Sequence, residues 1–396
     1  MRHFKSLIVL ALFVCGCGGG GSTVDMIQIG GTFSASTSSK VSTSSLSDVT
    51  QVIVFSTDNY YVTTVSSDGS FSVSAPKSAP VGMIFAGSDN SFKGYLTLGS
   101  DIDSIPLTAI KSGVTNIDLK TLLNSGKVVT PGHNPLGTEI ILTSKEKNMV
   151  AHANGLFASV VKNPDVDGNG QIDLLEGKFY WAGLIYFVEG GTFSGTTVTP
   201  TTPADIAGYK MLLDAKDAIL PTTVRFTGPS SSGLACNNGS DTNTYTERST
   251  YFSCMVSSPT VPPAGDYDVT YSGKTFTFSM PDQSGAKDNI VLMVPSVTLN
   301  SDNTINKISW IFISADGTTM IAPSLLFNTL EIQIEGTGTP CATYPQTGRL
   351  YNSDQIAITP AEHTLKCQNI QWSKVTNINM TYNDLYGNHY VPAYRK

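Results

Sequence analysis

Short runs in which apolar and polar residues alternate recur along the chain, with Gly, Asp and Pro between them. A period of two puts every second side chain on the same face of a strand, so such runs predict half-buried β-strands. The first group lies at 51–55, 60–65, 71–75, 83–86, 94–98 and 114–119. Asp68-Gly69, between two of these runs, is typical of a hairpin turn. We therefore expect an N-terminal β-sandwich over residues 28–123.

The same alternation returns in the second half of the chain, at 267–271, 276–280, 308–312, 330–334 and 378–382. A Thr- and Pro-rich stretch at 194–203 reads as a linker or long turn. Residues 204–219 fit either a helix or a strand. We expect a C-terminal β-sandwich region over residues 190–396, formed by one large sandwich or two small ones. The predicted fold is mainly β, with two or three β-sandwich domains.

The order strand, Asp68-Gly69-Ser70-Phe71, strand, then Gly94-Tyr95 resembles the carboxypeptidase-regulatory-like sandwich modules of exported proteins. This resemblance implies a spacing or binding role for residues 28–123.

Residues 165–176 carry oxygen-bearing side chains at positions 1, 3, 5, 9 and 12 of a twelve-residue segment: Asp165, Asp167, Asn169, Asp173 and Glu176. The backbone carbonyl of Gln171 falls at position 7. Gly170 at position 6 permits a sharp turn, and Ile172 at position 8 is an apolar anchor. Ca²⁺ takes six to eight oxygen ligands, which this spacing supplies. The segment resembles the calcium loop of the EF-hand family, and the resemblance covers these twelve residues.

The surroundings of this segment depart from a regular EF-hand. Pro164 directly precedes the loop, where an entering helix usually continues. The chain has no second complete loop to pair with it. An unpaired extracellular site is typical of structural Ca²⁺, with a dissociation constant of about 10⁻⁴ to 10⁻³ M. We expect Ca²⁺ to be a clamp between the β regions; the alternative is an acidic, Gly-rich turn that binds no ion.

A helix is predicted before the loop. Thr143-Ser144-Lys145-Glu146 forms a capping box. Apolar residues follow at helical spacing at Met149, Val150, Ala153, Phe157, Val160 and Val161. We expect one helix over residues 144–162. The apolar run 179–188 after the loop is either an exit helix or a buried strand, and residues 124–189 form the predicted helix plus calcium loop segment.

The N-terminus carries an export signal. Arg2 and Lys5 precede an apolar run, 7–14, that is too short to span a bilayer. Val14-Cys15-Gly16-Cys17 and four following glycines resemble the lipobox of bacterial lipoproteins. The resemblance implies cleavage of the signal peptide, residues 1–16, acylation of Cys17, a tether over 17–27 and sorting to the outer membrane. We expect a lipid anchor in the cell envelope; the alternative is an ordinary cleaved signal.

Four further cysteines predict disulfides in an exported chain: Cys236, Cys254, Cys341 and Cys367. Four cysteines allow three connectivities, and we favour the neighbouring pairs, Cys236–Cys254 and Cys341–Cys367. Each closed loop contributes roughly 3 kcal/mol. No C-x-x-C or C-x-x-C-H sequence points to a redox pair, a zinc site or attached haem.

The net charge and the motifs of the sequence limit the classes of function to be considered. Without Arg2 and Lys5 the chain has 22 basic and 31 acidic residues, a net charge of about −9, which disfavours nucleic acid as a partner. No G-x-S-x-G, H-E-x-x-H, Walker or dinucleotide motif occurs. His133 lies in a loop and is expected to be solvated. Four C-terminal tyrosines at four-residue spacing predict either an aromatic platform for sugars or, as we prefer, packing on the sandwich.

These features together predict an exported, lipid-anchored, calcium-binding protein with a non-catalytic binding or structural role. Its partner would be a surface protein or a carbohydrate. The alternatives are a secreted hydrolase, acting on carbohydrate or peptide, and an adhesion or surface-assembly subunit.

Overall fold

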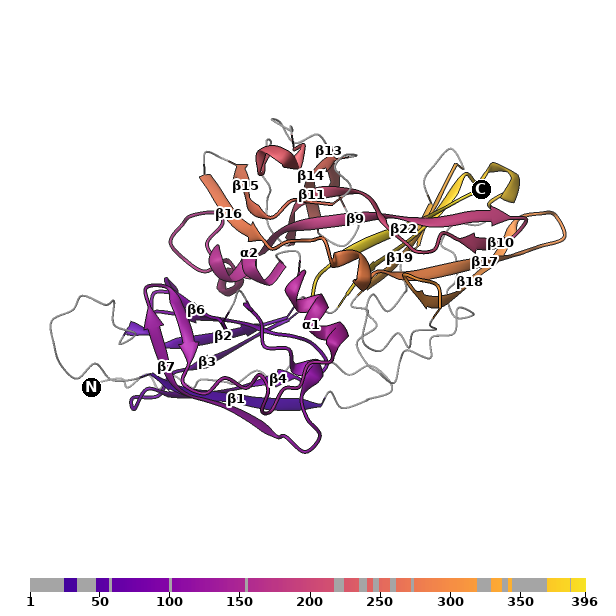
Figure 1. Ribbon diagram of the computed structural model, residues 1–396. Helices are drawn as coiled ribbons and strands as arrows, with labels where there is room; N and C mark the ends of the chain where they lie inside the picture. Colours follow the sequence, from indigo (N-terminus) through magenta and orange to yellow (C-terminus); the bar gives the residue numbers. More distant parts are fainter. Residues whose placement is uncertain are drawn as a thin grey trace, which may run out of the picture.

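The computed structural model describes residues 25–33, 48–56, 59–99, 102–153, 156–216, 224–234, 241–244, 249–256, 261–271, 274–318, 329–336, 341–343, 369–384 and 386–396. Over these ranges the chain is mainly β, as predicted. Figure 1 shows the N-terminal strands on one side, the C-terminal strands on the other, and two short helices between them. Among the described residues, no helix combines the length and apolarity needed to cross a membrane.

An eight-stranded curled sheet forms the N-terminal region. Its order is β3 (Tyr60–Thr64), β2 (Gln51–Phe55), β5 (Gly82–Ala86), β6 (Phe92–Leu96), β8 (Val128–Pro131), β7 (Asn116–Ser125), β1 (Met26–Phe33) and β4 (Ser70–Pro76). Burial alternates along β4, where Phe71 and Val73 enter the core and Ser72 is exposed. The edge strands β3 and β4 are consecutive in the chain and are joined by a turn at Asp68-Gly69, but they do not form the predicted hairpin, because β3 pairs with β2 and β4 pairs with β1. The sheet continues past residue 123, because β7 crosses that position and β8 follows it.

The C-terminal region is built around β9 (Phe179–Ser194), a sixteen-residue strand. The apolar run at 179–188 is therefore a strand and not an exit helix. Its first part pairs antiparallel with β11 (Ile206–Lys216), so the described part of the ambiguous segment 204–219 forms a strand and not a helix. Its last residues pair with β10 (Thr197–Pro200), while 185–192 pair in parallel with β22 (His389–Arg395).

Eleven strands share this sheet. Eight of them follow one another in the order β13 (Asp241–Thr244), β14 (Ser249–Val256), β11, β9, β22, β21 (Asn377–Asn383), β19 (Thr329–Glu335) and β20 (Cys341–Thr343). The other three branch from β9 in the order β10, β17 (Val291–Leu299) and β18 (Ile305–Ser314). A separate three-stranded sheet contains β12 (Val224–Thr227), β15 (Gly265–Tyr271) and β16 (Lys274–Met280). Short 3₁₀ turns lie at Leu107–Ala109, Asp173–Glu176, Ser230–Ser232, Ala286–Asn289 and Trp372–Lys374.

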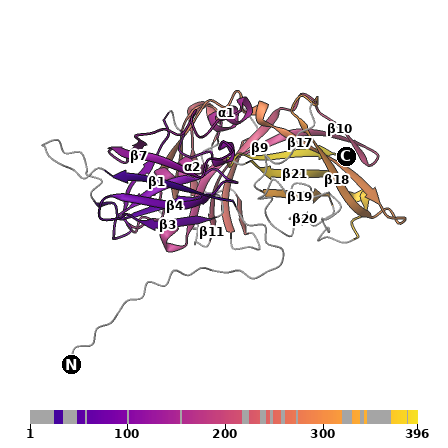
Figure 2. The ribbon, with the colours of Figure 1, turned by 90° about the horizontal axis from the view of Figure 1, so that it is seen from below.

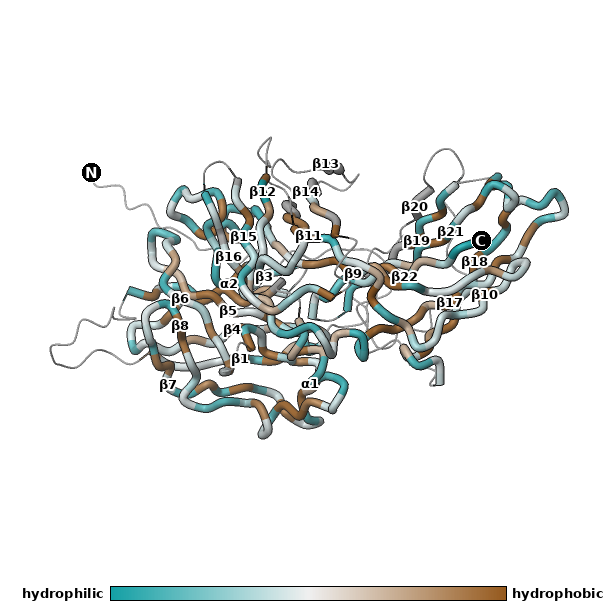
Figure 3. The backbone as a smooth tube through the Cα atoms, turned by 45° about the horizontal axis from the view of Figure 1, so that its top comes forward, coloured by the Kyte–Doolittle hydropathy of each residue, from teal (hydrophilic) through white to brown (hydrophobic). Residues whose placement is uncertain are grey.

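One hydrophobic core joins the eleven-stranded and three-stranded sheets. Tyr186 of β9, Tyr209 of β11 and Tyr267 of β15 are all completely buried in it. The N-terminal sheet has its own core, which includes Ile29 and Phe85. Figure 2 shows the two regions end to end, and Figure 3 shows hydrophobic stretches along strands of both.

The single helix predicted over residues 144–162 is wrong: two helices form, α1 (Ser144–Ala151) and α2 (Leu156–Lys162). The predicted capping box is present, since the Thr143 side chain accepts from the Glu146 N–H and the Glu146 carboxylate accepts from the Thr143 N–H. His152 caps the end of α1, with its Nδ1 2.7 Å from the Asn148 carbonyl oxygen. α1 ends at Ala151, and His152 and Ala153 follow it outside any helix.

Because the predicted helix is divided in two, its apolar side chains pack in two different places. Met149 of α1 is buried in the C-terminal core. Phe157 of α2 packs with Phe55 of the N-terminal sheet, their ring centroids 5.8 Å apart, in a small third cluster. The two helices therefore connect the β regions instead of lying on one of them.

The four C-terminal tyrosines form no exposed platform. Tyr382, Tyr386, Tyr390 and Tyr394 are each at most 1% exposed, and the rings of Tyr382 and Tyr390 stack at 5.1 Å. The packing alternative is therefore confirmed, although β22 lies inside the sheet between β9 and β21 instead of at its edge.

A buried carboxyl accompanies these rings. Asp384 is 2% exposed. Its Oδ1 accepts hydrogen bonds from the backbone N–H groups of Tyr386 and Asn388, at 2.8 and 2.9 Å. Its Oδ2 accepts one from the side-chain amide of Asn388 at 2.8 Å. Burial raises the pKa of Asp384 to about 7, against these hydrogen bonds and the positive charge of Lys145.

Candidate metal centre

The predicted calcium loop follows α2 and is attached to both β regions. Ile172, the predicted apolar anchor, is completely buried in the third cluster. Its N–H donates at 3.0 Å to the carbonyl oxygen of Asn90, in the turn between β5 and β6 of the N-terminal region. Lys274 of β16 donates from its ammonium to the Asp167 carbonyl. The loop therefore contacts the N-terminal sheet at one point and the three-stranded sheet at another.

The loop closes through its glycines. Gly168 and Gly170 have φ of +68° and +92°, in the region that L side chains rarely adopt. The Gly170 N–H donates to Asp165 Oδ2 at 3.0 Å, so the chain turns back onto the first carboxylate of the loop. Gly170 thus makes the sharp turn that its position in the sequence predicted.

Three of the six predicted ligand residues lie together. Asp165, Asp167 and Asp173 each offer one carboxylate oxygen, and these oxygens lie within 4.8 Å of one another. Asp173 is only 3% exposed, and its Oδ2 accepts from the Val166 N–H at 2.6 Å. This group could hold a metal ion.

Burial and like charge shape the electrostatics of this cluster. Burial, helped by the negative charges of Asp167 and Asp165, raises the pKa of Asp173 to about 7, although the hydrogen bond from the Val166 N–H and the charge of Lys178 lower it. For Asp167 burial is outweighed by hydrogen bonds from Lys178 and from the Asn169 N–H, which lower its pKa. Without a metal ion, Asp173 is thus the carboxyl at which negative charge costs most.

Two oxygens of the cluster lack a donor. Asp165 Oδ1 and Asp173 Oδ1 are buried, and neither accepts a hydrogen bond within the described parts of the chain. A buried charged oxygen without a donor costs several kcal/mol in order of magnitude, and a bound cation would satisfy it. All the ligand atoms on offer are oxygens, which suits Ca²⁺ or Mg²⁺ better than softer metals. The residues therefore fit a hard divalent cation.

Two further predicted ligands, Asn169 and Glu176, lie beside this cluster. The Asn169 side-chain Nδ2 donates to both carboxylate oxygens of Glu176, at 2.9 Å each, and its Oδ1 accepts from the Gln171 N–H at 2.8 Å. Gln171 itself is exposed. Glu176 thus presents both of its oxygens to one donor, as a bidentate calcium ligand would present them to the ion.

Two lysines that the sequence did not suggest are part of this site. Lys178 Nζ lies 2.6 Å from Asp167 Oδ2 and 3.1 Å from Glu176 Oε2. Its place two residues after Glu176 is a signal that sequence reasoning could have used. Lys274 lies 107 residues after Asp167 in the sequence, so only the fold brings the two together.

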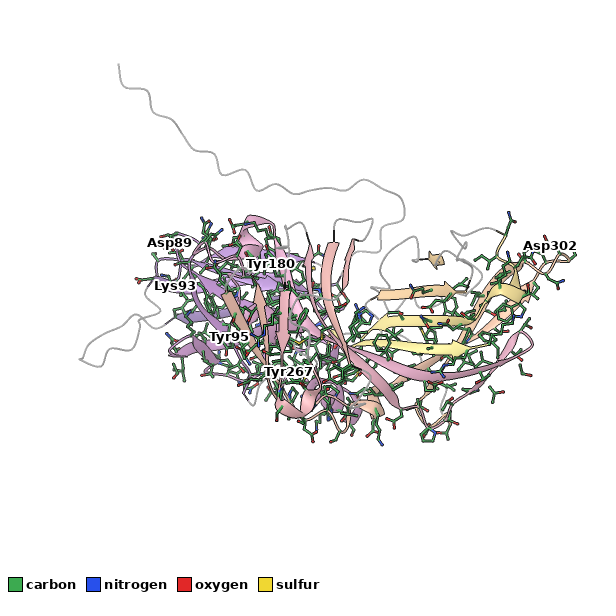
Figure 4. The ribbon with its side chains drawn as sticks, turned by 90° about the horizontal axis from the view of Figure 1, so that it is seen from above. Asp89, Lys93, Tyr95, Tyr180, Tyr267 and Asp302 are labelled. Atoms are coloured by element: carbon green, nitrogen blue, oxygen red, sulfur yellow. The ribbon has the colours of Figure 1, made fainter. Side chains whose placement is uncertain are left out.

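Asp302 and Asn303, which repeat only a fragment of the calcium-loop pattern, are not near this loop. Figure 4 places Asp302 at the far end of the C-terminal region, well away from Tyr180, which follows the loop in β9. Asp302 instead accepts hydrogen bonds from the backbone and hydroxyl of Thr304 within a turn.

A cavity of about 410 Å³ lies between the β regions, and it bears on the hydrolase alternative. Its lining includes Asp103, Ser104, Lys162 and Tyr386, and no histidine is among the described residues that line it. Lys162 and Asp103 form an ion pair at 3.2 Å. His133 lies elsewhere, with its Nε2 2.9 Å from Glu139 Oε1. The cavity does not bring together a Ser–His–Asp arrangement.

Several predicted residues lie outside this description. Residues 1–24, with the lipobox and Cys17, are not among the described residues, and neither are Cys236 and Cys367. Cys254 is completely buried in β14, and the side chain of Cys341 is not described. Acylation and both disulfide pairings therefore stay predictions.

Comparison with known proteins adds little to this geometry. No family model and no curated protein matches the sequence. One solved structure, described as a Ca²⁺-stabilized adhesin that helps an Antarctic bacterium reach out and bind ice, is 12% identical over 88% of this chain and 89% of its own. Its TM-score is 0.13, and a likeness at that level carries no argument about fold or function.

Proposed function

We propose that this chain is an exported, lipid-anchored calcium-binding protein in which Ca²⁺ clamps two β regions together and supports a non-catalytic surface role. The observation that carries the proposal is the pair of buried carboxylate oxygens without donors, Asp165 Oδ1 and Asp173 Oδ1. They belong to a loop whose sequence has the ligand spacing of an EF-hand and whose backbone contacts both β regions.

A cation in this loop would act as a clamp for an electrostatic reason. Asp165, Asp167 and Asp173 repel one another at short range, and burial raises the cost of charging Asp173. A bound divalent cation would attract all three carboxylates, so holding them close together would become favourable. Because Ile172 and Asp167 connect the loop to different sheets, ordering the loop also stabilises the contact between those sheets.

The proposed location follows from the N-terminal sequence. A basic start, a short apolar run and Cys17 before a glycine tether support export and acylation. Outside the cytoplasm Ca²⁺ sites typically work at about 10⁻⁴ to 10⁻³ M, which suits a single unpaired loop. A surface protein or a carbohydrate is the proposed partner class, and the acidic charge argues against nucleic acid.

Thermal unfolding of residues 24–396 in EDTA and in millimolar Ca²⁺ tests the clamp. At ten times Kd, linkage gives about 1.4 kcal/mol of added stability, so Tm is expected to rise. Asp165→Ala and Glu176→Ala each remove a ligand side chain and are expected to abolish the rise. Asp288→Asn makes a similar charge change at an exposed position and should keep it. An unchanged Tm in Ca²⁺ for the unmodified chain would refute the proposal.

A further inference from the structure

Lys178 holds two of the residues that the proposed function assigns to Ca²⁺. Its ammonium is within 2.6 Å of Asp167 Oδ2 and 3.1 Å of Glu176 Oε2, and both are expected calcium ligands. Lys178 is close to Glu176 in the sequence as well, because it follows Glu176 by two residues and directly precedes β9.

The other donor at Glu176 is the Asn169 amide, which faces both carboxylate oxygens at 2.9 Å. Ca²⁺ requires oxygen ligands, so an Asn at this position contributes its carbonyl oxygen and not its amide nitrogen. The loop as described is therefore closed by two hydrogen-bond donors, an ammonium and an amide, that face ligand oxygens. Both must turn away from those oxygens before a calcium ion can take them.

We propose that Lys178 is the affinity-determining residue of this site: its ammonium is an internal counter-ion of Asp167 and Glu176 and competes with Ca²⁺ for both. This inference rests on the proposed calcium-binding function. A calcium ion then binds only by displacing a tethered cation, so the site responds to high Ca²⁺ concentrations and not to trace amounts.

The competition is between two cations for the same oxygens. A lysine ammonium is positively charged at physiological pH, and that of Lys178 lies 2.6 Å from Asp167 Oδ2 and 3.1 Å from Glu176 Oε2. Its side chain is 29% exposed, which leaves a route to solvent once a metal ion takes its place.

Lys274 provides a matched comparison inside the same loop. Its ammonium contacts the backbone carbonyl of Asp167 and no carboxylate of the predicted ligand set among the described contacts. Neutralising Lys274 therefore changes the local charge as neutralising Lys178 does, without freeing a carboxylate. Comparing the two lysine variants therefore separates direct competition for the carboxylates from a general electrostatic effect on Ca²⁺ binding.

The test measures Ca²⁺ affinity of the full mature chain, purified in detergent, by isothermal titration. Lys178→Met is expected to lower Kd at least tenfold, Lys274→Met to change it less than threefold, and Lys178→Arg not to lower it. Equal tightening by both Met variants would overturn the proposal, since general charge would then explain it. An unchanged Kd in Lys178→Met would also overturn it.

A second readout follows the lysine itself. Acetylation rates measured by mass spectrometry should show Lys178 protected in EDTA and at least threefold more reactive in saturating Ca²⁺, with Lys287, which is exposed, unchanged. If Lys178 is equally protected from acetylation with and without Ca²⁺, the proposed displacement of its ammonium by Ca²⁺ is wrong. If the unmodified chain is folded and binds no Ca²⁺, the proposed function fails; if it binds Ca²⁺ with Lys178 still protected, only this inference fails.

Discussion

Replacing Asp384 with Asn should remove a large part of the pH dependence of stability. Asp384 is 2% exposed, and burial raises its pKa to about 7 from its ordinary value of 3.8. Between these two values the folded chain keeps the proton that the unfolded chain has lost. The free energy of unfolding must then fall as the pH rises through this window. A buried Asn resembles the protonated carboxyl and does not titrate.

The size of the effect follows from the two pKa values. One pKa unit corresponds to about 1.4 kcal/mol, so linkage between pH 5 and pH 8 removes about 3 kcal/mol of stability through this one carboxyl. The near-complete burial of Asp384 means that solvent screening does not reduce this figure much. Lys145, whose own pKa is lowered by burial, is the nearby cation and partly offsets the cost.

Urea unfolding in EDTA at pH 5 and pH 8 measures this difference. The unmodified chain should lose about 3 kcal/mol more than Asp384→Asn on going from pH 5 to pH 8. Every other titrating group, including Asp173, is present in both proteins, so the comparison isolates Asp384. Asp288→Asn, an exposed change, should behave as the unmodified chain does. Equal losses in Asp384→Asn and in the unmodified chain would refute the reasoning.

Two further substitutions test the joint between the β regions. Phe157→Ala should lower the free energy of unfolding by about 3–5 kcal/mol, because the ring fills the space beside Phe55 and Gly82. Denaturant titrations measure this loss, and a loss below about 1 kcal/mol would contradict the packing role of Phe157. Gly170→Ala should cost about 1–2 kcal/mol through backbone strain alone, since φ is +92° and a Cβ there meets no other atom. The same variant should weaken Ca²⁺ binding in a titration, and an unchanged Kd would show that the turn is not needed for the site.

Local patterns predicted much of this molecule. Alternation located most strands, and the twelve-residue spacing located three carboxylates that the fold does bring together, Asp165, Asp167 and Asp173. These predictions succeed because a strand face and a tight loop are set by neighbours in sequence.

Long-range pairing could not be read from the same patterns. The parallel contact between β9 and β22 joins residues about two hundred positions apart, and no local signal encodes it. Helical spacing from Met149 to Phe157 was real, yet it could not show that a break would send the two side chains into different cores. The Tyr spacing in the last strands was likewise ambiguous until β22 was placed inside the sheet.

The position of β22 also sets the order in which the C-terminal region can fold during synthesis. Its seven residues are made after all the other described strands, yet they separate β9 from β21 in the middle of the sheet. Bringing residue 389 beside residue 185 closes a loop of about two hundred residues, at an entropic cost of about 5 kcal/mol. Until then β9 and β21 each lack the partner between them. Folding of this region must therefore wait until β22 has been made, and a chain cut short before β22 would expose two open strands to other molecules.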